Sequence, residues 1–333
     1  MISVVMPSYN SAAFIAEAIE SVLAQTFPYF ELLVCDDGST DGTQAIVQEY
    51  TRRDRRVRLL QHGFRSVSRN CNAAMEAARY DWIARLDADD IMHRHRLERQ
   101  MAAAAADPSV VLWGGFARLI DRTGRILRTA ALGPTSEAGF QELRHSGRMI
   151  VILGPTVMFR RSLALELGGY DPRFDSAEDL ELLDRLADHG SVRAIPRMLS
   201  RYRIHGTSVT ATSAVRQARL LRYIDARNRA RVEGRPAPTL EAYIEALDRA
   251  APLARLTEWA DGRARLHYRN ASVHHAERRL GRALVSVGLA ITFNPAFALG
   301  RINNRFVRSL MRRLHPATGT AEMASTVPED TGL

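Results

Sequence analysis

The chain has 333 residues, of which 46% are hydrophobic and 25% are charged, and its formal net charge is +9 with an isoelectric point near 10.2. This composition is typical of a soluble globular protein with one large domain, and the two cysteines in apolar segments exclude a disulfide framework. The positive charge favours contact with phosphates, nucleic acid or an acidic membrane face, or else it marks a basic surface without a specific partner.

Strand and helix patterns alternate over the first 90 residues. The amino terminus lacks a basic segment and a long apolar run, so we expect a core strand there and no signal peptide. Short apolar runs predict buried strands at 2–6, 30–35, 57–60 and 82–86. Between them, apolar residues at helical spacing predict helices. This alternation predicts a parallel sheet with right-handed crossovers. Polar clusters follow three of these strands, at the edge where ligands bind in such sheets.

The pattern changes after about residue 110. Two strand patterns flank the turn sequence at 121–124 and predict a hairpin, and a helix is expected over 177–189. Further strands are predicted at 154–159, 192–195 and 199–204, which together indicate a mixed sheet. From residue 214 the sequence is helical in pattern and rich in arginine. We therefore predict a domain at 1–212, a helical basic region at 213–315 and a disordered tail at 316–333.

Residues 284–299 are mostly apolar, but Asn294 and Pro295 interrupt them, so the segment is too short to span a membrane. Arginines flank it on both sides: Arg278, Arg279, Arg282, Arg301, Arg305, Arg308, Arg312 and Arg313. One interpretation is a helix lying on an anionic membrane face, and the other is a helical subdomain packed on the core or on a partner chain. We expect a cytoplasmic protein, and the first interpretation adds peripheral contact with the inner face of the cytoplasmic membrane.

Three polar clusters could carry chemistry. Asp87, Asp89 and Asp90 end the fourth strand, and three carboxylates this close repel one another unless a hard divalent ion, Mn²⁺ or Mg²⁺, lies among them. The alternative is a helix start with acidic residues that the helix dipole stabilises. Asp36 and Asp37 could accept hydrogen bonds from a base or a ribose, or could only cap a turn. The Pro-Ser-Tyr-Asn loop after the first strand offers an aromatic face for stacking, or is only a connecting loop.

The motifs appear in a specific order. The first half contains Val5-Met6-Pro7-Ser8-Tyr9-Asn10, Val34-Cys35-Asp36-Asp37-Gly38-Ser39, Arg69-Asn70 with Ala73, and Leu86-Asp87-Ala88-Asp89-Asp90. The second half contains Gly168-Gly169-Tyr170-Asp171, Ala177-Glu178-Asp179 and Tyr202-Arg203-Ile204-His205-Gly206. This ordered set resembles family 2 glycosyltransferases over about residues 1–210. The resemblance implies an α/β fold of the GT-A type, with a Rossmann-like nucleotide-binding sheet, a mixed acceptor half and, in this chain, a C-terminal helical extension.

The resemblance also implies roles for individual residues. A nucleotide-sugar donor, most simply a UDP-sugar, would be bound by Pro7, Tyr9, Asp37, Arg69 and Asp87, with Asp37 facing the base. Asp89 and His205 would bind the divalent metal, Mn²⁺ or Mg²⁺. Asp179 would be the general base that activates a hydroxyl of a glycan or lipid-linked acceptor. The family inverts the anomeric carbon, and these acceptors indicate cell-surface polysaccharide or lipopolysaccharide synthesis.

One segment departs from the family pattern, and several alternatives remain. The glycine-rich turn that usually precedes Arg69 is altered at 62–68, which puts the conformation of that loop in doubt. A dinucleotide-dependent oxidoreductase would need a Gly-x-Gly-x-x-Gly loop after the first strand, which this chain lacks. A nucleotidyltransferase would instead release pyrophosphate, and a membrane-associated scaffold could keep the fold without catalysis. No nucleic-acid module with interleaved aromatic residues is evident, so nucleic acid is not an expected partner.

Overall fold

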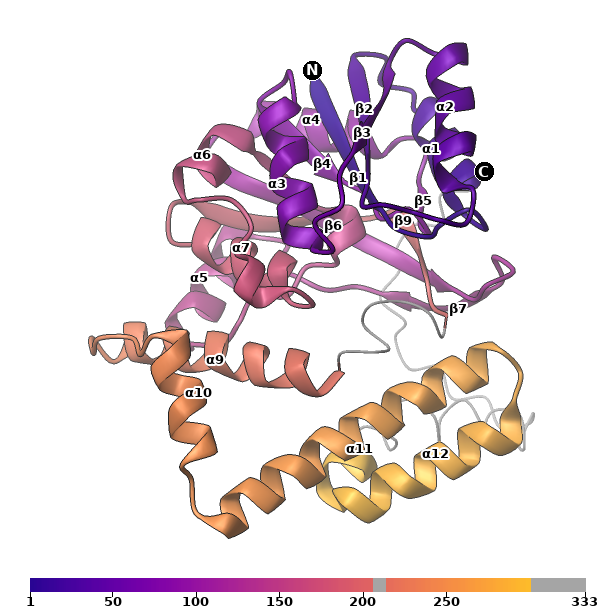
Figure 1. The fold of residues 1–333 in the computed structure, drawn as a ribbon. Helices are drawn as coiled ribbons and strands as arrows, with labels where there is room; N and C mark the ends of the chain where they lie inside the picture. The colour runs from indigo at the N-terminus through magenta and orange to yellow at the C-terminus, as the bar shows by residue number, and fades with distance from the viewer. Residues whose placement is uncertain (206–213, 301–333) are drawn as a thin grey trace, which may run out of the picture.

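The computed structural model describes residues 1–205 and 214–300, which form one mixed sheet covered by helices and a set of further helices beyond it (Figure 1). The strand order is β3-β2-β1-β4-β8-β6-β9-β5, and β7 pairs with β6 at the side of this path. The strands are β1 Ile2–Ser8, β2 Phe30–Asp36, β3 Val57–Gln61, β4 Trp82–Arg85, β5 Ile91–Met92, β6 Val110–Ile120, β7 Ile126–Ala130, β8 Met158–Arg160 and β9 Ser191–Arg203.

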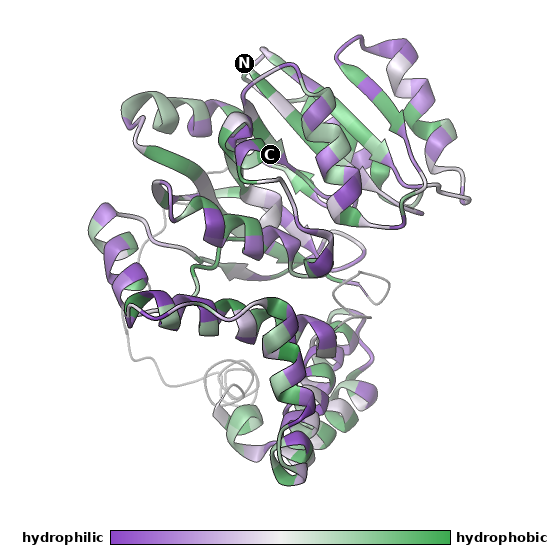
Figure 2. Cartoon of the chain, turned by 60° about the vertical axis from the view of Figure 1, so that its left-hand side comes forward, coloured by the Kyte–Doolittle hydropathy of each residue, from purple (hydrophilic) through white to green (hydrophobic). Residues whose placement is uncertain are grey.

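The first four strands form the parallel half that the sequence predicts, because β3, β2, β1 and β4 pair side by side in parallel. Side chains alternate across this sheet, so that Val4 packs in one core cluster with Ile19, and Val5 in another with Cys71. All seven residues of β2 are buried, as expected for a strand covered on both faces. Figure 2 shows these strands as mainly hydrophobic between helices of mixed character. The helices of this half are α1 Ile15–Leu23, α2 Thr43–Arg53, α3 Val67–Ala77 and α4 Arg96–Ala106.

The second half of the sheet is mixed, as predicted. β8 runs antiparallel to β4 and β6, while β6 and β9 are parallel. The hairpin prediction is confirmed by β6 and β7, whose turn is held by Asp121: its Oδ1 accepts the backbone N–H groups of Thr123 and Arg125. The helices in this half are α5 Glu137–His145, η1 Gly154–Thr156, α6 Arg161–Glu166, η2 Pro172–Phe174 and α7 Glu178–Leu186.

Two strand predictions in this half are wrong in detail. The strand expected at 154–159 begins only at Met158, because Pro155 starts a 3-10 turn in which Thr156 N–H donates to Leu153 O. The two strands expected at 192–195 and 199–204 are one strand, β9. Its pairing with β6 shifts register between Gly115 and Phe116, so the ladder continues past the interruption.

After the sheet, the described residues form four helices. Phe174 of η2 packs with Tyr223 of α9 and Leu240 of α10, while α11 lies against α9 and pairs along its length with α12 (Figure 1). The helices are α9 Ala214–Val232, α10 Leu240–Asp248, α11 Pro252–Ala276 and α12 Leu280–Phe293. In the ranges that the structure describes, no helix is both long and apolar enough to cross a membrane. The predicted domain boundaries stay predictions. The predicted tail at 316–333 and the arginines at 301–313, which belong to the predicted helical basic region, lie outside the described residues.

Candidate active site

The loops after β1 and β2 are joined at the carboxyl edge of the parallel strands. Asn10 N–H donates to Ser39 Oγ at 2.8 Å, and Thr40 N–H donates to Asn10 Oδ1 at 2.9 Å. Asp36 holds the second loop from within, because its Oδ2 accepts the N–H groups of Gly38 and Ser39. The polar clusters that follow these two strands therefore meet, as the predicted sheet requires.

Asp37 supports the loop in which the sequence departs from the family pattern. Its two carboxylate oxygens accept the backbone N–H groups of Arg65 at 3.0 Å and Ser66 at 2.9 Å. Ser66 in turn caps α3 by accepting the N–H of Arg69. The loop is thus ordered by Asp37, and the altered glycine turn does not prevent α3 from starting at Val67. The Asp37 carboxylate is buried by this arrangement.

The other predicted nucleotide-binding residues surround this loop. Tyr9 follows β1 and is 58% exposed, so one face of its ring can stack on a ligand. Pro7 lies within β1, opposite Cys35 in the ladder. Arg69 is exposed in the first turn of α3. Pro7 and Tyr9 thus lie at the carboxyl end of β1 and Arg69 at the start of α3, and their contacts with a nucleotide stay predictions.

The acidic turn after β4 meets the end of β9. Asp89 Oδ2 lies 2.7 Å from His205 Nε2, although the two residues are 116 positions apart in the sequence. Arg203 fastens the same turn, because its N–H donates to Asp90 Oδ1 at 2.7 Å and its Nε donates to Asp89 O at 2.7 Å. Burial, together with the neighbouring carboxylates, raises the pKa of Asp90 well above its usual range.

The residues of this turn fit a divalent cation in part. Within residues 1–205 and 214–300, no three metal-ligating side chains gather into a complete site. Asp89 and His205 supply one carboxylate and one imidazole at contact distance, which is a donor set that Mn²⁺ accepts. Asp90 Oδ2 is buried without a hydrogen-bond partner, so an uncompensated acceptor also lies in this turn. Diphosphate oxygens could complete the coordination of such an ion.

Asp179 lies in the first turn of α7, at the edge of the same site. Its Oδ1 accepts the N–H of Leu180 at 2.8 Å, and its Oδ2 lies over the Cα of Gly154. A Cβ at position 154 would come within 2.8 Å of Asp179 Oδ2, so glycine leaves the room that this carboxylate occupies. Burial raises the pKa of Asp87, Arg85 lowers it, and the charges of Asp89 and Asp179 raise it further. Asp87 and Asp179 are therefore close enough to interact.

A buried ion pair that the sequence analysis missed joins the two sides of the site. Arg85, the last residue of β4, donates from Nε to Asp87 Oδ1 and from Nη2 to Glu178 Oε1, both at 3.0 Å. Arg85 and Glu178 are each only 5% exposed. Burial raises the pKa of Glu178 to about 7, against the lowering effect of Arg85. The one sequence signal was an arginine in an otherwise apolar strand that ends two residues before Asp87.

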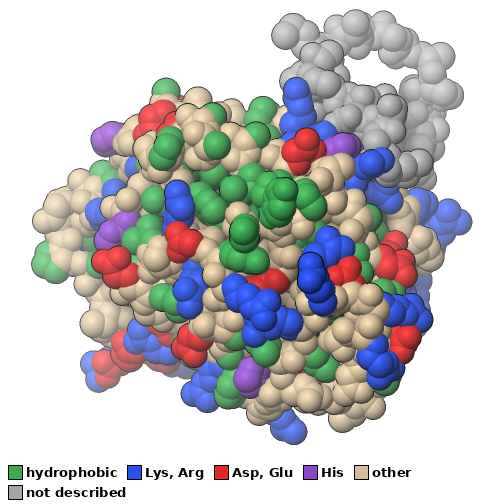
Figure 3. Space-filling model, turned by 90° about the horizontal axis from the view of Figure 1, so that it is seen from above, with side chains coloured by type: hydrophobic (Ala, Val, Ile, Leu, Met, Phe, Trp, Pro, Cys, Tyr) green, Lys and Arg blue, Asp and Glu red, His purple; other side chains and the backbone are tan. Residues whose placement is uncertain are grey.

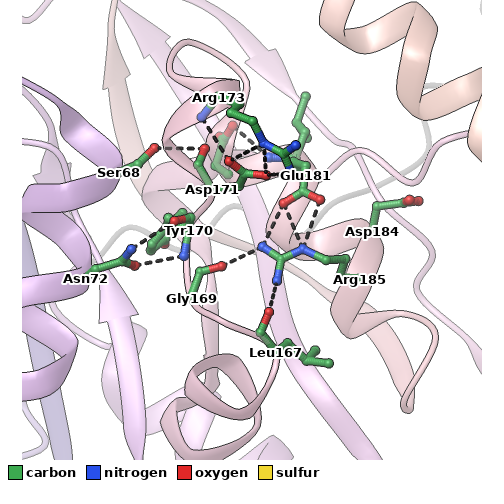
Figure 4. A network of polar contacts seen from close by, with 12 residues as sticks. Ser68, Asn72, Leu167, Gly169, Tyr170, Asp171, Arg173, Glu181, Asp184 and Arg185 are labelled. Atoms are coloured by element: carbon green, nitrogen blue, oxygen red, sulfur yellow. Dashed lines mark hydrogen bonds and ion pairs between the residues drawn. The ribbon is translucent and has the colours of Figure 1, made fainter. Parts of the chain in front are cut away.

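The Gly168-Gly169-Tyr170-Asp171 motif forms a structural brace (Figure 4). Asn72 of α3 exchanges two hydrogen bonds with the backbone of Tyr170, each at 2.8 Å. Arg185 of α7 donates to the carbonyl oxygens of Leu167 and Gly169 while it pairs with Glu181. Gly169 has φ +68°, and a Cβ there would overlap Asn72 Oδ1. These contacts hold residues 167–170 to α3 on one side and to α7 on the other. Asp179 lies in the first turn of α7.

Comparisons with known proteins agree with this geometry. A family model described as "Glycosyl transferase family 2" matches residues 3–168. The putative glycosyltransferase EpsE of Bacillus subtilis is 32% identical over 194 residues, which are 57% of this chain and 67% of EpsE. The UDP-Glc:alpha-D-GlcNAc-diphosphoundecaprenol beta-1,3-glucosyltransferase WfgD of Escherichia coli is 37% identical over 117 residues, which are 35% of this chain and 46% of WfgD. The chain thus spans two thirds of EpsE but less than half of WfgD.

Solved structures match the fold over most of the chain. S. aureus TarS 1–349 in complex with UDP-GlcNAc has a TM-score of 0.55 at 18% identity, covering 90% of this chain and 92% of that one. The mannosyltransferase PcManGT from Pyrobaculum calidifontis, in complex with GDP-Man and Mn²⁺, has a TM-score of 0.54 at 18% identity, covering 94% and 82%. At these identities the matches establish the shared GT-A fold with its C-terminal helices.

Proposed function

The chain belongs to glycosyltransferase family 2, and on that premise we propose that it transfers a sugar from a nucleoside-diphosphate sugar, most simply a UDP-sugar, to a hydroxyl of a glycan or lipid-linked acceptor. The contact of Asp89 with His205, beside Asp87 and Asp179, is the observation that best supports this proposal. The name of WfgD and the complex of TarS with UDP-GlcNAc support a UDP-sugar donor. The diphosphoundecaprenol in the name of WfgD supports a lipid-linked acceptor, which fits a role in cell-surface polysaccharide or lipopolysaccharide synthesis.

Donor binding is proposed at the edge formed by the β1 and β2 loops. Tyr9 would stack on the base, and Asp37 would face it from the loop that it already orders. Pro7 and Arg69 would line the nucleotide, and Asp87 would contact the ribose or the metal shell. The exposure of Tyr9 and Arg69 on either side of buried Asp37 supports this arrangement.

Metal binding is proposed at Asp89 and His205, with Mn²⁺ or Mg²⁺ as the ion. When bound, the ion would neutralise charge on the departing nucleoside diphosphate. The protein would hold two of its ligands, and Arg203 would keep the acidic turn and the end of β9 together. The PcManGT structure, which is in complex with GDP-Man and Mn²⁺, supports a metal in a protein of this fold.

Asp179 is proposed as the general base of an inverting displacement. Its carboxylate would accept the proton of the acceptor hydroxyl while that oxygen attacks the anomeric carbon and the nucleoside diphosphate leaves from the opposite side. Its position over Gly154 leaves Oδ2 without a bulky neighbour on that side. Its hydrogen bond from Leu180 N–H holds the other oxygen, which favours one orientation of the carboxylate.

A thermal-shift panel tests the donor half of the proposal. UDP, GDP, TDP and CMP are each added with Mn²⁺ and with EDTA. A ligand that binds only the folded chain raises the melting temperature, because at 100 times its Kd it adds about 2.7 kcal/mol to the free energy of unfolding. We expect UDP with Mn²⁺ to give the largest shift, and Asp89→Ala to abolish the part that needs the metal. No shift with any nucleotide would contradict the proposal. Release of pyrophosphate during turnover would instead indicate a nucleotidyltransferase.

Peripheral membrane contact is proposed for the exposed face of α12. Leu284 and Val285 are 60% and 64% exposed, and with Leu289 they fall within about 140° of one side of the helix. Residues 283–300 contain no charged side chain. Arg278, Arg279 and Arg282 precede this run and are exposed, and five arginines without an acidic residue follow it in the sequence at 301–313. An apolar face between cationic ends matches an anionic bilayer surface.

The sheet half presents a different surface. Seen from above, basic and acidic side chains are interspersed around a group of hydrophobic ones (Figure 3). Flotation with vesicles of phosphatidylcholine, with and without about 30% phosphatidylglycerol, tests the difference: we expect binding only to the anionic vesicles, and less of it at high salt. The variant Leu284→Glu/Val285→Glu should not float, while the control Ile126→Glu, on exposed β7, should behave as wild type. A different result would favour packing of α12 on a partner chain: the wild type would not bind vesicles but would run as a dimer on gel filtration, and the Leu284→Glu/Val285→Glu variant would run as a monomer.

A further inference from the structure

Arg85 occupies a rigid position between the two halves of the site. Its N–H donates to Val157 O, and its own carbonyl accepts from Arg96 Nη2 at 2.9 Å. β4 is paired on both sides, with β1 and with β8. The guanidinium therefore projects from a backbone that neighbouring strands and a fully buried arginine hold in place.

The partner Glu178 holds the turn that leads into α7. Its Oε1 accepts from Arg85, and its Oε2 accepts the N–H of Ser176 at 3.0 Å. Ser176 is a buried non-glycine residue with φ +91°, a conformation that side-chain-bearing residues rarely adopt. Gln217 of α9 holds the same residue by donating to its carbonyl. Glu178 thus helps to stabilise a strained turn three residues before Asp179.

The ion pair connects two segments of the site. Arg85 bonds Asp87 on the donor side with one nitrogen and Glu178, the neighbour of Asp179, with another. A guanidinium can donate along two directions at once from a planar fork, whereas an ammonium group is a compact point charge. A pair that only neutralised buried charge would not need to connect these two segments, which lie 93 positions apart in the sequence.

We propose that Arg85 and Glu178 are positioning residues that set the placement of Asp87 relative to Asp179, and so align the donor with the base. The inference rests on the proposed function. It assigns the pair no contact with substrate. It predicts that breaking the bridge misplaces both carboxylates while each keeps its own chemistry.

The double variant Arg85→Gln/Glu178→Gln tests this assignment, because it removes the bridge without changing the net charge of the chain and without leaving the Glu178 carboxylate buried alone. Asp87 also loses its partner, but its side chain is 30% exposed and can be hydrated. The matched control is Arg58→Gln/Glu31→Gln, which removes a 2.7 Å ion pair at the amino ends of β2 and β3, away from the site. Melting temperature, the Kd for UDP in Mn²⁺ and in EDTA, and kcat at saturating donor are measured for both variants and for the wild type.

We expect both double variants to melt earlier, but only the Arg85/Glu178 variant to change the site. Its kcat should fall on the order of 100-fold, as a misplacement of about 1 Å predicts. Its Kd for UDP should rise about fivefold, the effect of one weakened hydrogen bond. Equal kcat and Kd values in the two double variants would overturn the inference, because a purely structural pair affects only the melting temperature.

Arg85→Lys keeps the assignment testable where the double variant does not fold. Lysine retains the charge but not the two-way fork, so kcat should still fall at least about tenfold with a smaller loss of melting temperature. A kcat within about threefold of wild type would overturn the inference. A wild-type chain that neither binds UDP nor transfers sugar would contradict the proposed function itself and the inference with it, and that result is distinct from an unaffected variant.

Discussion

The sheet half buries several of its arginines, whereas the arginines at the start of α12 in the α11–α12 hairpin are exposed. All 46 basic residues of the chain are arginines. In the sheet half, Arg96 is fully buried and donates to three backbone carbonyls, and Arg203 is buried and donates to the acidic turn and to Glu17. In the hairpin, Arg278 and Arg282 are exposed at the start of an apolar helix. A net charge of +9 therefore does not describe one basic surface, because part of that charge is an internal scaffold.

The largest expected effect concerns the carboxylate of Asp179, in the first turn of α7. Asp179→Asn should lower kcat by about 10³-fold, since an amide cannot accept the acceptor proton. The Kd for UDP should stay within about twofold, because Asp179 is proposed to act only on the acceptor side. Isothermal titration and initial rates give the two values. Unchanged turnover would remove Asp179 from the role of base.

The contrast between buried and exposed arginine is tested next. Arg96→Ala should lower the free energy of unfolding by about 3–5 kcal/mol, because it leaves buried carbonyls without donors and opens a cavity. Arg282→Ala should change it by less than about 0.5 kcal/mol, since its side chain is exposed. Urea denaturation measures both. Similar losses in the two variants would break the comparison between the regions.

Glycine shows the same contrast on a smaller scale. Gly154→Ala should lower kcat about 10- to 100-fold, because the new Cβ would lie 2.8 Å from Asp179 Oδ2 and displace it. The matched control is Gly281→Ala in α12, where a Cβ meets no atom within 4 Å. We expect the control to keep full kcat. Full activity of Gly154→Ala would show that the carboxylate tolerates the shift.

The smallest expected effect is a gain of stability in the hairpin. Gly288 lies inside α12 with open space around its Cβ position. Gly288→Ala should raise the free energy of unfolding by up to about 1 kcal/mol and so raise the melting temperature slightly, because alanine loses less backbone entropy than glycine when the helix forms. Thermal unfolding followed by circular dichroism measures this. A loss of stability would mean that α12 packs more closely than its exposed face indicates.

Much of the sheet follows from local sequence patterns. Short apolar runs between helical patterns located β1 to β4, and turn residues located the β6–β7 hairpin. Both could be predicted because the conformation of a buried strand or a tight turn is largely determined by residues close together in the sequence. α4 is absent from that prediction, because two of the residues that it buries at helical spacing, Arg96 and Gln100, are polar and so hide the buried stripe. β5 is too short to produce a pattern, and it forms through pairing with β9, about 110 residues later.

The site was less accessible to sequence reasoning. The ordered motifs of the family indicated Asp89 and His205, and the structure brings these two side chains into contact. The Arg85–Glu178 bridge could not be predicted, because a single sequence carries no information on which distant charges pair. The roles of all the predicted site residues stay predictions: Pro7, Tyr9, Asp37, Arg69, Asp87, Asp89, Asp179 and His205.

The bridge also has a consequence for how this sequence can diverge. Two positions 93 residues apart share one buried interaction, so a change at Arg85 leaves Glu178 without its charge partner, and a change at Glu178 leaves Arg85 paired with Asp87 alone. Substitutions at 85 and 178 should therefore be inherited together, and related chains that lack the arginine should also lack the glutamate.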